Sequence, residues 1–280
     1  YSEAVPFCHN EACLLPREVS NQKHIRSRLQ VSPRPAVLDP WTDIFGNRMH
    51  YFAIQSPHSK MTVTATSEIE TYPQPSLPEA ETTPAWEHVR DGLKRDSDPA
   101  MQEAIQFGFE SSYIEMSGGL VEYISHSFTP GRPILEASLE LMQRIYEEFT
   151  YDPVATTVAT PLPDVLNNRR GVCQDFAHLG IACLRAIGLP ARYVSGYLET
   201  LPPPGQPKLQ GSDASHAWFS VYIPSLGWVD LDPTNNKRPD EQYITTAWGR
   251  DYGDVTPLKG VLFGGGTHQL NVEVDVLRQN

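Results

Sequence analysis

Hydrophobic residues recur at helical spacing in two stretches of the second half of the chain. After Cys173, the first stripe consists of Ala177, Gly180, Ile181, Leu184 and Ile187. Gly188 and Pro190 follow it and predict the end of a helix. The second stripe consists of Leu135, Leu139, Met142, Tyr146 and Phe149. We expect two helices packed beside each other in one core, with Cys173 in the first turn of its helix.

Alternating and β-branched residues predict strands in the remaining parts of the chain. In the first 72 residues the candidates are 28–31, 50–54 and 61–66, and a tight turn is expected at Asp43–Asn47. In the second half they are 191–198, 213–222, 228–232 and 271–277. The pattern thus predicts an α+β fold, with a cysteine-bearing helix packed on a sheet and a small β domain in front.

Prolines and polar residues divide this pattern into three parts. A stretch from Tyr72 to about Pro84 is rich in Pro, Glu and Thr and is typical of a linker. We therefore predict an N-terminal β domain at 1–75, a linker with short helical segments at 76–128, and a catalytic core at 129–280. The proline- and glycine-rich stretch 201–211 is expected to form a rim of the cleft.

The composition of the chain restricts the classes of partner that we expect it to bind. The net charge of -12 and the pI of about 5.2 argue against nucleic acid or an anionic membrane as a partner. No apolar run is long enough to cross a bilayer, and the start at Tyr1 lacks a basic-then-apolar leader. Either the start was trimmed or a leader was removed, and we expect a cytoplasmic protein. The oligomeric state does not follow from the sequence.

The four cysteines are too few for a disulfide framework in a chain of 280 residues. Cys8 and Cys13 could be free thiols, a weak metal pair or a disulfide, and we favour free thiols. Cys183 lies in the middle of the cysteine-bearing helix and is expected to be a packed core residue.

Cys173, His216 and Asp232 are the candidate catalytic residues. The free N–H groups and partial positive charge at a helix start stabilise a thiolate. His216 begins one predicted strand, and Asp232 ends the next one at a proline. A cysteine, a histidine and a carboxylate are the groups required for nucleophilic acyl transfer. A buried structural thiol, or a zinc site using Cys173 and His216, is the competing interpretation; the zinc site lacks a second pair of ligands.

Four blocks carry a family resemblance: Gly171–Ala177, Gly188–Tyr197, Ser215–Trp218 and Asp232–Thr234. In this order they resemble the core of the bacterial transglutaminase-like superfamily. The first 72 residues, with the Asp43-x-x-Gly46-Asn47 turn, resemble the N-terminal β domain of its bacterial members. The resemblance implies a papain-like fold with Cys173, His216 and Asp232 as the triad. We expect the β domain to be a scaffold without chemistry of its own.

Several neighbours of the triad have more than one interpretation. Gln174 and Asp175 could support an oxyanion or the loop, although helix capping explains Asp175 equally well. Trp218 could wall the cleft beside His216 or fill the core. His178 is expected to lie on the surface or in a supporting position. We expect no cofactor and no metal, since no Asp-x-Asp-x-Asp-Gly calcium loop is present.

The position of Asp232 relative to His216 depends on the strand register. A plain hairpin closed by Pro224–Gly227 pairs Ile223 with Trp228 and places His216 and Asp232 on opposite faces. A bulge or a different turn would return them to one face. Asp230 has the same parity as Asp232. We predict that Asp232 contacts His216 and that Asp230 points elsewhere.

The expected function is thiol-dependent acyl transfer on a peptide bond or a glutamine carboxamide of a peptide or protein. Water as the acceptor makes a peptidase or amidase, and an amine makes a transglutaminase. The family resemblance favours hydrolysis by analogy. The alternative of another class is a peptide-binding module of the same fold that does no chemistry. Selective alkylation of Cys173 would favour the enzyme.

Overall fold

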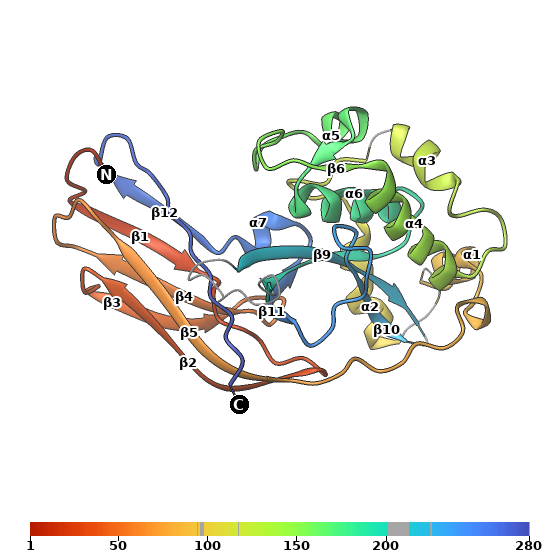
Figure 1. Ribbon diagram of the computed structural model, residues 1–280, viewed down its shortest axis with the longest axis horizontal. Helices are drawn as coiled ribbons and strands as arrows, with labels where there is room; N and C mark the ends of the chain where they lie inside the picture. The colour runs from red at the N-terminus through yellow and green to blue at the C-terminus, as the bar shows by residue number, and fades with distance from the viewer. Residues whose placement is uncertain (94, 96–97, 117, 201–212, 225, 280) are drawn as a thin grey trace, which may run out of the picture.

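The chain forms a β-rich half and a mixed half that lie side by side (Figure 1). The computed structural model describes residues 1–93, 95, 98–116, 118–200, 213–224 and 226–279. The β-rich half contains the N-terminal strands, and the mixed half contains the cysteine-bearing helix. The expected α+β fold, with a cysteine-bearing helix on an antiparallel sheet and a β domain in front, is confirmed.

The β-rich half has two antiparallel sheets. The larger has the strand order β12-β1-β4-β3, formed by β12 (Leu258–Phe263), β1 (Phe7–Ala12), β4 (Arg48–Ile54) and β3 (Val37–Thr42). The smaller pairs β2 (Gln22–Ser32) with β5 (Thr62–Thr71). Alternate residues of β1 point inward, and a small apolar core around Phe52 and Ile54 holds the two sheets together. The tight turn predicted at Asp43–Asn47 connects β3 and β4.

Strand β12 comes from the end of the chain, yet it pairs with β1 along its whole length. In the ribbon this blue strand lies among the red and orange N-terminal strands (Figure 1). The division at 1–75, 76–128 and 129–280 stays a prediction, but a strand assigned to the last segment completes the first sheet. The chain therefore crosses twice between the two halves.

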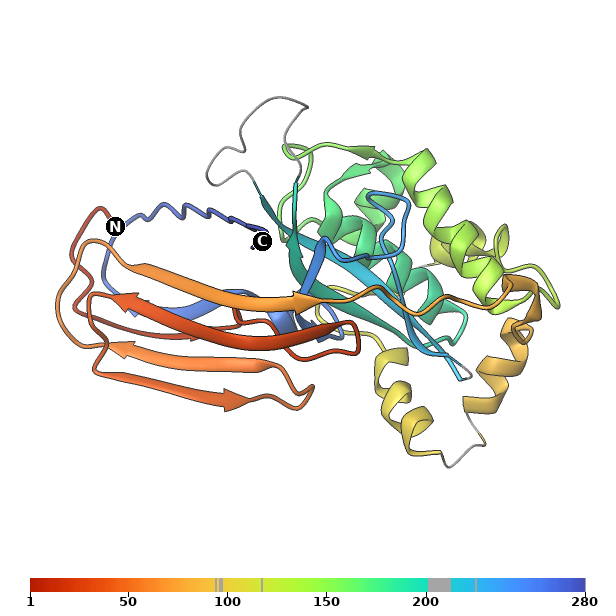
Figure 2. The ribbon, with the colours of Figure 1, turned by 60° about the horizontal axis from the view of Figure 1, so that its bottom comes forward.

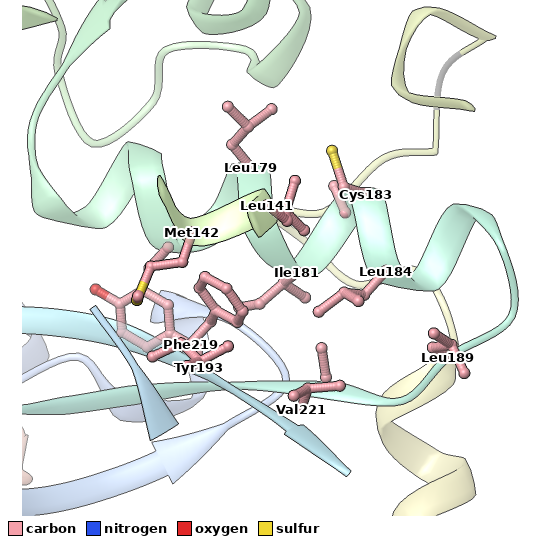
Figure 3. Close-up of a cluster of buried hydrophobic side chains, with 14 of the residues drawn as sticks. Leu141, Met142, Leu179, Ile181, Cys183, Leu184, Leu189, Tyr193, Phe219 and Val221 are labelled. Atoms are coloured by element: carbon pink, nitrogen blue, oxygen red, sulfur yellow. The ribbon is translucent and has the colours of Figure 1, made fainter. Parts of the chain in front are cut away.

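The sheet of the mixed half has the strand order β10-β9-β8-β11 and is antiparallel throughout. Its strands are β8 (Ala191–Leu198), β9 (Ala214–Ile223), β10 (Gly227–Leu231) and β11 (Tyr243–Gly249). Helix α6 (Cys173–Ala186) packs on one face of this sheet. Ile181 and Leu184 of the helix meet Phe219 and Val221 of β9 in the core (Figure 3). Burial of these side chains fixes the height of the helix above the strand that carries His216.

The second predicted helix is α4 (Ile134–Glu148), which contributes Leu141 and Met142 to the same core (Figure 3). Shorter helices, as expected for 86–128, cover the outside of the mixed half, together with a parallel pair of two-residue strands. They are η1 (Ala80–Thr82), α1 (Trp86–Leu93), α2 (Pro99–Ile105), η2 (Gln106–Gly108), α3 (Gly118–Ser125), α5 (Leu162–Asn168) and α7 (Tyr252–Val255), with β6 (Thr150–Tyr151) and β7 (Arg170–Gly171).

The strand predicted at 271–277 is wrong. Only Val274 makes a bridge, to Asp213 just before β9, and the C-terminal segment otherwise runs along the β-rich half and ends beside the mixed half (Figure 2). On the apolar side of the alternation Val272 is 67% exposed, and Val274 and Val276 are only partly buried, so this side lacks a core in which to bury itself. The expected cleft rim at 201–211 lies outside the described residues. Among the helices that are described, none has the length and apolar character needed to cross a membrane.

Candidate active site

Cys173 is the first residue of α6 and its side chain is partly exposed. The loop before it is tied to the helix by Asp175, whose carboxylate accepts hydrogen bonds from Val172 N (2.8 Å) and Thr156 Oγ1 (2.6 Å). A Cβ on Gly171 would lie 2.7 Å from Asp175 Oδ2, so glycine is required for this close approach. Burial raises the pKa of Asp175, while these two hydrogen bonds act in the opposite direction. The contacts of Asp175 are those of a helix cap.

The turn between β9 and β10 decides where Asp232 lies. Gly227, and not Trp228, pairs with Ile223, so the plain four-residue hairpin is wrong. Leu226 N donates to Ile223 O (2.9 Å), and Gly227 follows at φ +74°. This is a three-residue loop followed by a residue in the left-handed region, which favours glycine. The one-residue change of register returns Asp232 to the face of His216, as the alternative turn requires.

Asp232 is fully buried and holds the ring of His216. Its Oδ2 atom accepts hydrogen bonds from His216 Nε2 (2.7 Å), Tyr243 Oη (2.6 Å) and Asn235 Nδ2 (2.7 Å). Its Oδ1 atom accepts one from Thr234 N (2.8 Å). Because Nε2 is engaged by the carboxylate, Nδ1 is the ring nitrogen left for the thiol of Cys173, which is among the groups that raise the pKa of His216. The structure therefore brings Cys173, His216 and Asp232 together.

The electrostatics favour a charged imidazole. Burial lowers the pKa of His216, but the hydrogen bonds and charges of Asp232 and Cys173 outweigh it and raise the pKa to about 10. Burial alone would raise the pKa of Asp232, yet its bonds to His216, Tyr243 and Asn235 lower it. Burial, followed by the charge of Asp232, raises the pKa of Tyr243, so the phenol keeps the proton that it donates.

Asp230 lies on the same strand but has another partner. It lies opposite Ser220 in the ladder and accepts a hydrogen bond from Ser220 Oγ at 2.5 Å. The prediction that Asp232 contacts His216 and that Asp230 points elsewhere is therefore confirmed.

The other two candidates beside the triad, Trp218 and Gln174, lie in different surroundings. Trp218 is fully buried next to His216, with a ring-centroid separation of 6.2 Å, and packs edge to face on Tyr243 at 5.5 Å. It belongs to a small buried cluster with Val194 and Tyr243 and packs beside the imidazole. Gln174 lies at the second position of α6, and its Nε2 is 3.5 Å from Val158 O, at the limit of a hydrogen bond.

Of the two positions expected for His178, on the surface or in a supporting position, the surface one is wrong. The ring is 4% exposed, and its Nε2 accepts a hydrogen bond from Tyr252 N (3.1 Å). Burial lowers its pKa to about 4, so it is neutral near pH 7. The periodicity of α6 placed it away from the thiol but could not show that α7 covers that face.

The remaining cysteines are free and buried: Cys8, Cys13 and Cys183. Cys183 is part of the main core, as expected, and Cys8 and Cys13 form no disulfide with each other. Within the described part of the chain, no group of three or more His, Cys, Asp or Glu side chains could hold a metal ion.

Sequence reasoning missed two residues of this site, Tyr243 and Asn235. Asn235 follows Asp232 by three residues in the run Asp-Pro-Thr-Asn, a spacing typical of side chains that bond within a turn. Tyr243 carried no such signal, because its contact with Asp232 depends on the pairing of β11 with β8.

Comparison with known proteins agrees with this architecture. The sequence profile of the Transglutaminase-like superfamily matches residues 122–233, and that of the Bacterial transglutaminase-like N-terminal region matches residues 1–70. An uncharacterized protein of Mycobacterium tuberculosis (strain H37Rv) is 40% identical over 99% of this chain and 89% of its own length. A protein-glutamine gamma-glutamyltransferase of Pseudomonas aeruginosa is 33% identical over 137 residues, which are 45% of this chain and 20% of that protein.

A solved structure shares the fold. It is a Cytophaga hutchinsonii protein provisionally described as a cysteine protease, which superimposes with a TM-score of 0.70 at 24% identity and covers 92% of this chain and 82% of that one. The two profile matches and the 40% identity over nearly the whole chain show that the protein belongs to the bacterial transglutaminase-like superfamily.

Proposed function

We propose that this protein is a thiol-dependent hydrolase that cleaves a peptide bond or a glutamine carboxamide through Cys173, His216 and Asp232. One observation carries the proposal. A fully buried carboxylate, held by four donors, fixes Nε2 of an imidazole whose other side meets a thiol at a helix start. In this arrangement the thiol proton can pass to the ring, and the carboxylate fixes the tautomer.

In the acylation half, the Cys173 proton moves to His216 Nδ1, and Sγ attacks the carbonyl carbon. The carbonyl oxygen becomes an oxyanion, which can be stabilised by the N–H groups of the first turn of α6, since these have no partner within the helix. Next the C–N bond breaks, the proton of Nδ1 goes to the leaving amine or ammonia, and a thioester remains on Cys173.

In the deacylation half, His216 Nδ1 takes a proton from water, and the hydroxide oxygen attacks the thioester. The carbon–sulfur bond breaks, the acid leaves, and the proton returns to the sulfur. Asp232 keeps its charge throughout and stabilises the imidazolium twice in each cycle.

A mass-spectrometric screen tests the proposal. The protein is incubated with a peptide library and with glutamine-rich proteins, and products are scored for chain cleavage or deamidation. Cys173→Ala is expected to lower turnover about a thousandfold or more and to leave the fold intact. Cys183→Ala is the matched control, with the same change in the same helix, and should retain turnover. A Cys173→Ala protein with turnover within a few-fold of the wild type would refute the assignment.

Transamidation is the second candidate, and the similarity to the Pseudomonas protein-glutamine gamma-glutamyltransferase is what favours it. The same screen in the presence of a primary amine separates the two. Incorporation of the amine in excess of hydrolysis would favour transamidation. If neither kind of turnover is found and Cys173 is not alkylated selectively, the result would favour the alternative of a peptide-binding module that does no chemistry.

A further inference from the structure

The N-terminal β domain grips the free edge of the strand that carries Tyr243. Strand β11 is the last strand of the sheet in the mixed half, so within the described residues its outer edge has no strand partner. An uncovered edge presents unpaired backbone N–H and C=O groups. In the ribbon, β11 lies at the side of the mixed half that faces the N-terminal strands (Figure 1).

Two side-chain amides from the β domain occupy this edge. Gln22, at the start of β2, accepts from Thr245 N (2.8 Å) and donates to Thr245 O (2.9 Å). Asn47 accepts from Trp248 N (3.0 Å) and donates to Trp248 O (2.7 Å). Each amide thus bonds both backbone groups of a single residue, as the peptide of a neighbouring strand would.

The spacing of the two gripped residues depends on an irregularity of β11. In a regular strand, outward-facing N–H and C=O groups recur at every second residue. Thr245 and Trp248 are three apart, and the ladder between β11 and β8 shifts register by one residue between Thr245 and Ala247. The extra residue, Thr246, brings Thr245 and Trp248 to the same edge. Strand β11 is therefore shaped to fit these two amides.

Both amides are held rigidly. Gln22 and Asn47 are 2% and 0% exposed. Asp43, at the other end of the Asp43–Asn47 turn, accepts from Asn47 N (2.7 Å) and Asn47 Nδ2 (2.8 Å). Arg17 donates to Asn47 Oδ1 (2.5 Å), and its guanidinium lies over the Trp248 ring. The turn by which the β domain resembles its family is thus the part that docks on β11.

We propose that Gln22 and Asn47 are positioning residues for the triad, which act through Tyr243. Gln22 fixes β11 two residues from Tyr243, and the Tyr243 hydroxyl in turn holds the Asp232 oxygen that bonds His216. A change of a few tenths of an ångström in β11 is transmitted to this bond, because the phenol is buried and has no freedom to compensate. The inference rests on the proposed function and assigns a role in it to the β domain.

The test measures the rate of Cys173 alkylation by iodoacetamide at pH 5.5, followed by mass spectrometry of the whole protein. At this pH an ordinary thiol with a pKa near 8.5 is only about 0.1% thiolate. Fast alkylation at Cys173 therefore reports the thiolate–imidazolium pair and needs no substrate. Asp232→Asn must slow it. If alkylation is not slowed in this variant, the result refutes the proposed triad itself and is distinct from a failure of the β-domain inference.

The decisive experiment is a double-mutant cycle between Gln22→Met and Tyr243→Phe. Methionine keeps the length and volume of Gln22 but removes both amide bonds. We expect Gln22→Met to slow alkylation about fivefold in the wild type and less than about twofold in the Tyr243→Phe background, because residues that act through one backbone shift or hydrogen-bond network couple and independent ones do not. Equal slowing in both backgrounds, or no slowing at all, would overturn the inference.

Two further variants exclude a general loss of stability. Tyr197→Phe removes another hydrogen bond between the halves, from Tyr197 Oη to Leu14 O, and keeps the backbone pairing of Tyr197 with Ile244 of β11. It should leave alkylation within about twofold of the wild type. If Gln22→Met does not fold, Gln22→Asn retracts the same polar group by about 1.5 Å and should slow alkylation in the same direction. A Tyr197→Phe effect as large as that of the Gln22 variants would also overturn the inference.

Discussion

Replacing Asp232 by asparagine should disable the thiol–imidazole pair while leaving the shape of the site almost unchanged. The oxygen at Oδ2 accepts from three donors, and the oxygen at Oδ1 accepts from Thr234 N. An asparagine can place its oxygen at only one of these positions. With the oxygen at Oδ2, its NH2 group faces the N–H of Thr234. With the amide reversed, the NH2 group faces the donors of His216, Tyr243 and Asn235.

The first orientation opposes one donor and the second opposes several, so we expect the oxygen at Oδ2. The tautomer of His216 then survives, but the negative charge is lost. With Asp232 and Cys173 as partners, the pKa of His216 is about 10, against 6.5 for an ordinary histidine. Since each unit of pKa is tenfold in the ratio of protonated to neutral imidazole, loss of the larger part of this shift lowers the equilibrium constant for proton transfer from the Cys173 thiol to His216 on the order of a hundredfold to a thousandfold.

The assay is the rate of iodoacetamide alkylation of Cys173, with buried Cys8, Cys13 and Cys183 as internal references, followed by turnover at saturating substrate once one is known. Asp230→Asn is the matched control, because it makes the same change two residues away against Ser220. Alkylation of Cys173 should be slowed at least a hundredfold in Asp232→Asn and only mildly in Asp230→Asn. If the Asp230 variant were the slower one, the third member of the triad would be wrongly placed.

Two other predictions follow from the same geometry. Because the folded pKa of His216 is raised, its ion pair with Asp232 should stabilise the fold fully below about pH 6.5, and this contribution should be lost as the pH rises towards 10. The difference in Tm between wild type and Asp232→Asn should therefore be larger at pH 6 than at pH 10, and a constant difference would contradict the assigned charge. Gly227→Ala should cost about 1–2 kcal/mol, since its φ is +74° and an added Cβ meets no atom within 4 Å. Chemical denaturation should show a similar cost for Gly131→Ala, at φ +77°. Only the Gly227 variant should also slow Cys173 alkylation. Equal alkylation rates in the two variants would show that the turn at Gly227 does not affect the site.

Much of the mixed half could be predicted from local pattern. The stripe after Cys173 and the stop at Gly188 and Pro190 place helix α6 correctly, because the 3.6-residue period and the helix-breaking residues are properties of the local sequence. The strand that carries His216 follows in the same way from alternation. At 271–277 the same alternation misled, since a pattern of period two shows which face is apolar but not whether a core exists to bury it.

The register of the hairpin formed by β9 and β10 could be predicted only in part from the sequence. Parity restricts Asp232 to one of two faces, but the choice depends on whether Gly227 is inside the turn or is its left-handed last residue. Since glycine is compatible with both, the sequence leaves the register open. The resemblance of Asp232-Pro233-Thr234 to a family block was therefore needed to select Asp232, and the hydrogen bond to His216 agrees with that choice.

The support of the triad lies beyond either kind of reasoning, because its partners are distant in sequence. Tyr243 bonds Asp232 from a strand at the far edge of the sheet, and Gln22 reaches the same strand from 223 positions away. The sequence predicted that the β domain is a scaffold without chemistry of its own, because it gave no role to the polar side chains of this domain. Once Gln22 and Asn47 are seen to take the place of a fifth strand on β11, the same domain becomes a means of fixing the carboxylate. Its removal should then leave a chain with all three triad residues but with an uncovered sheet edge and an imidazole whose partner is free to move.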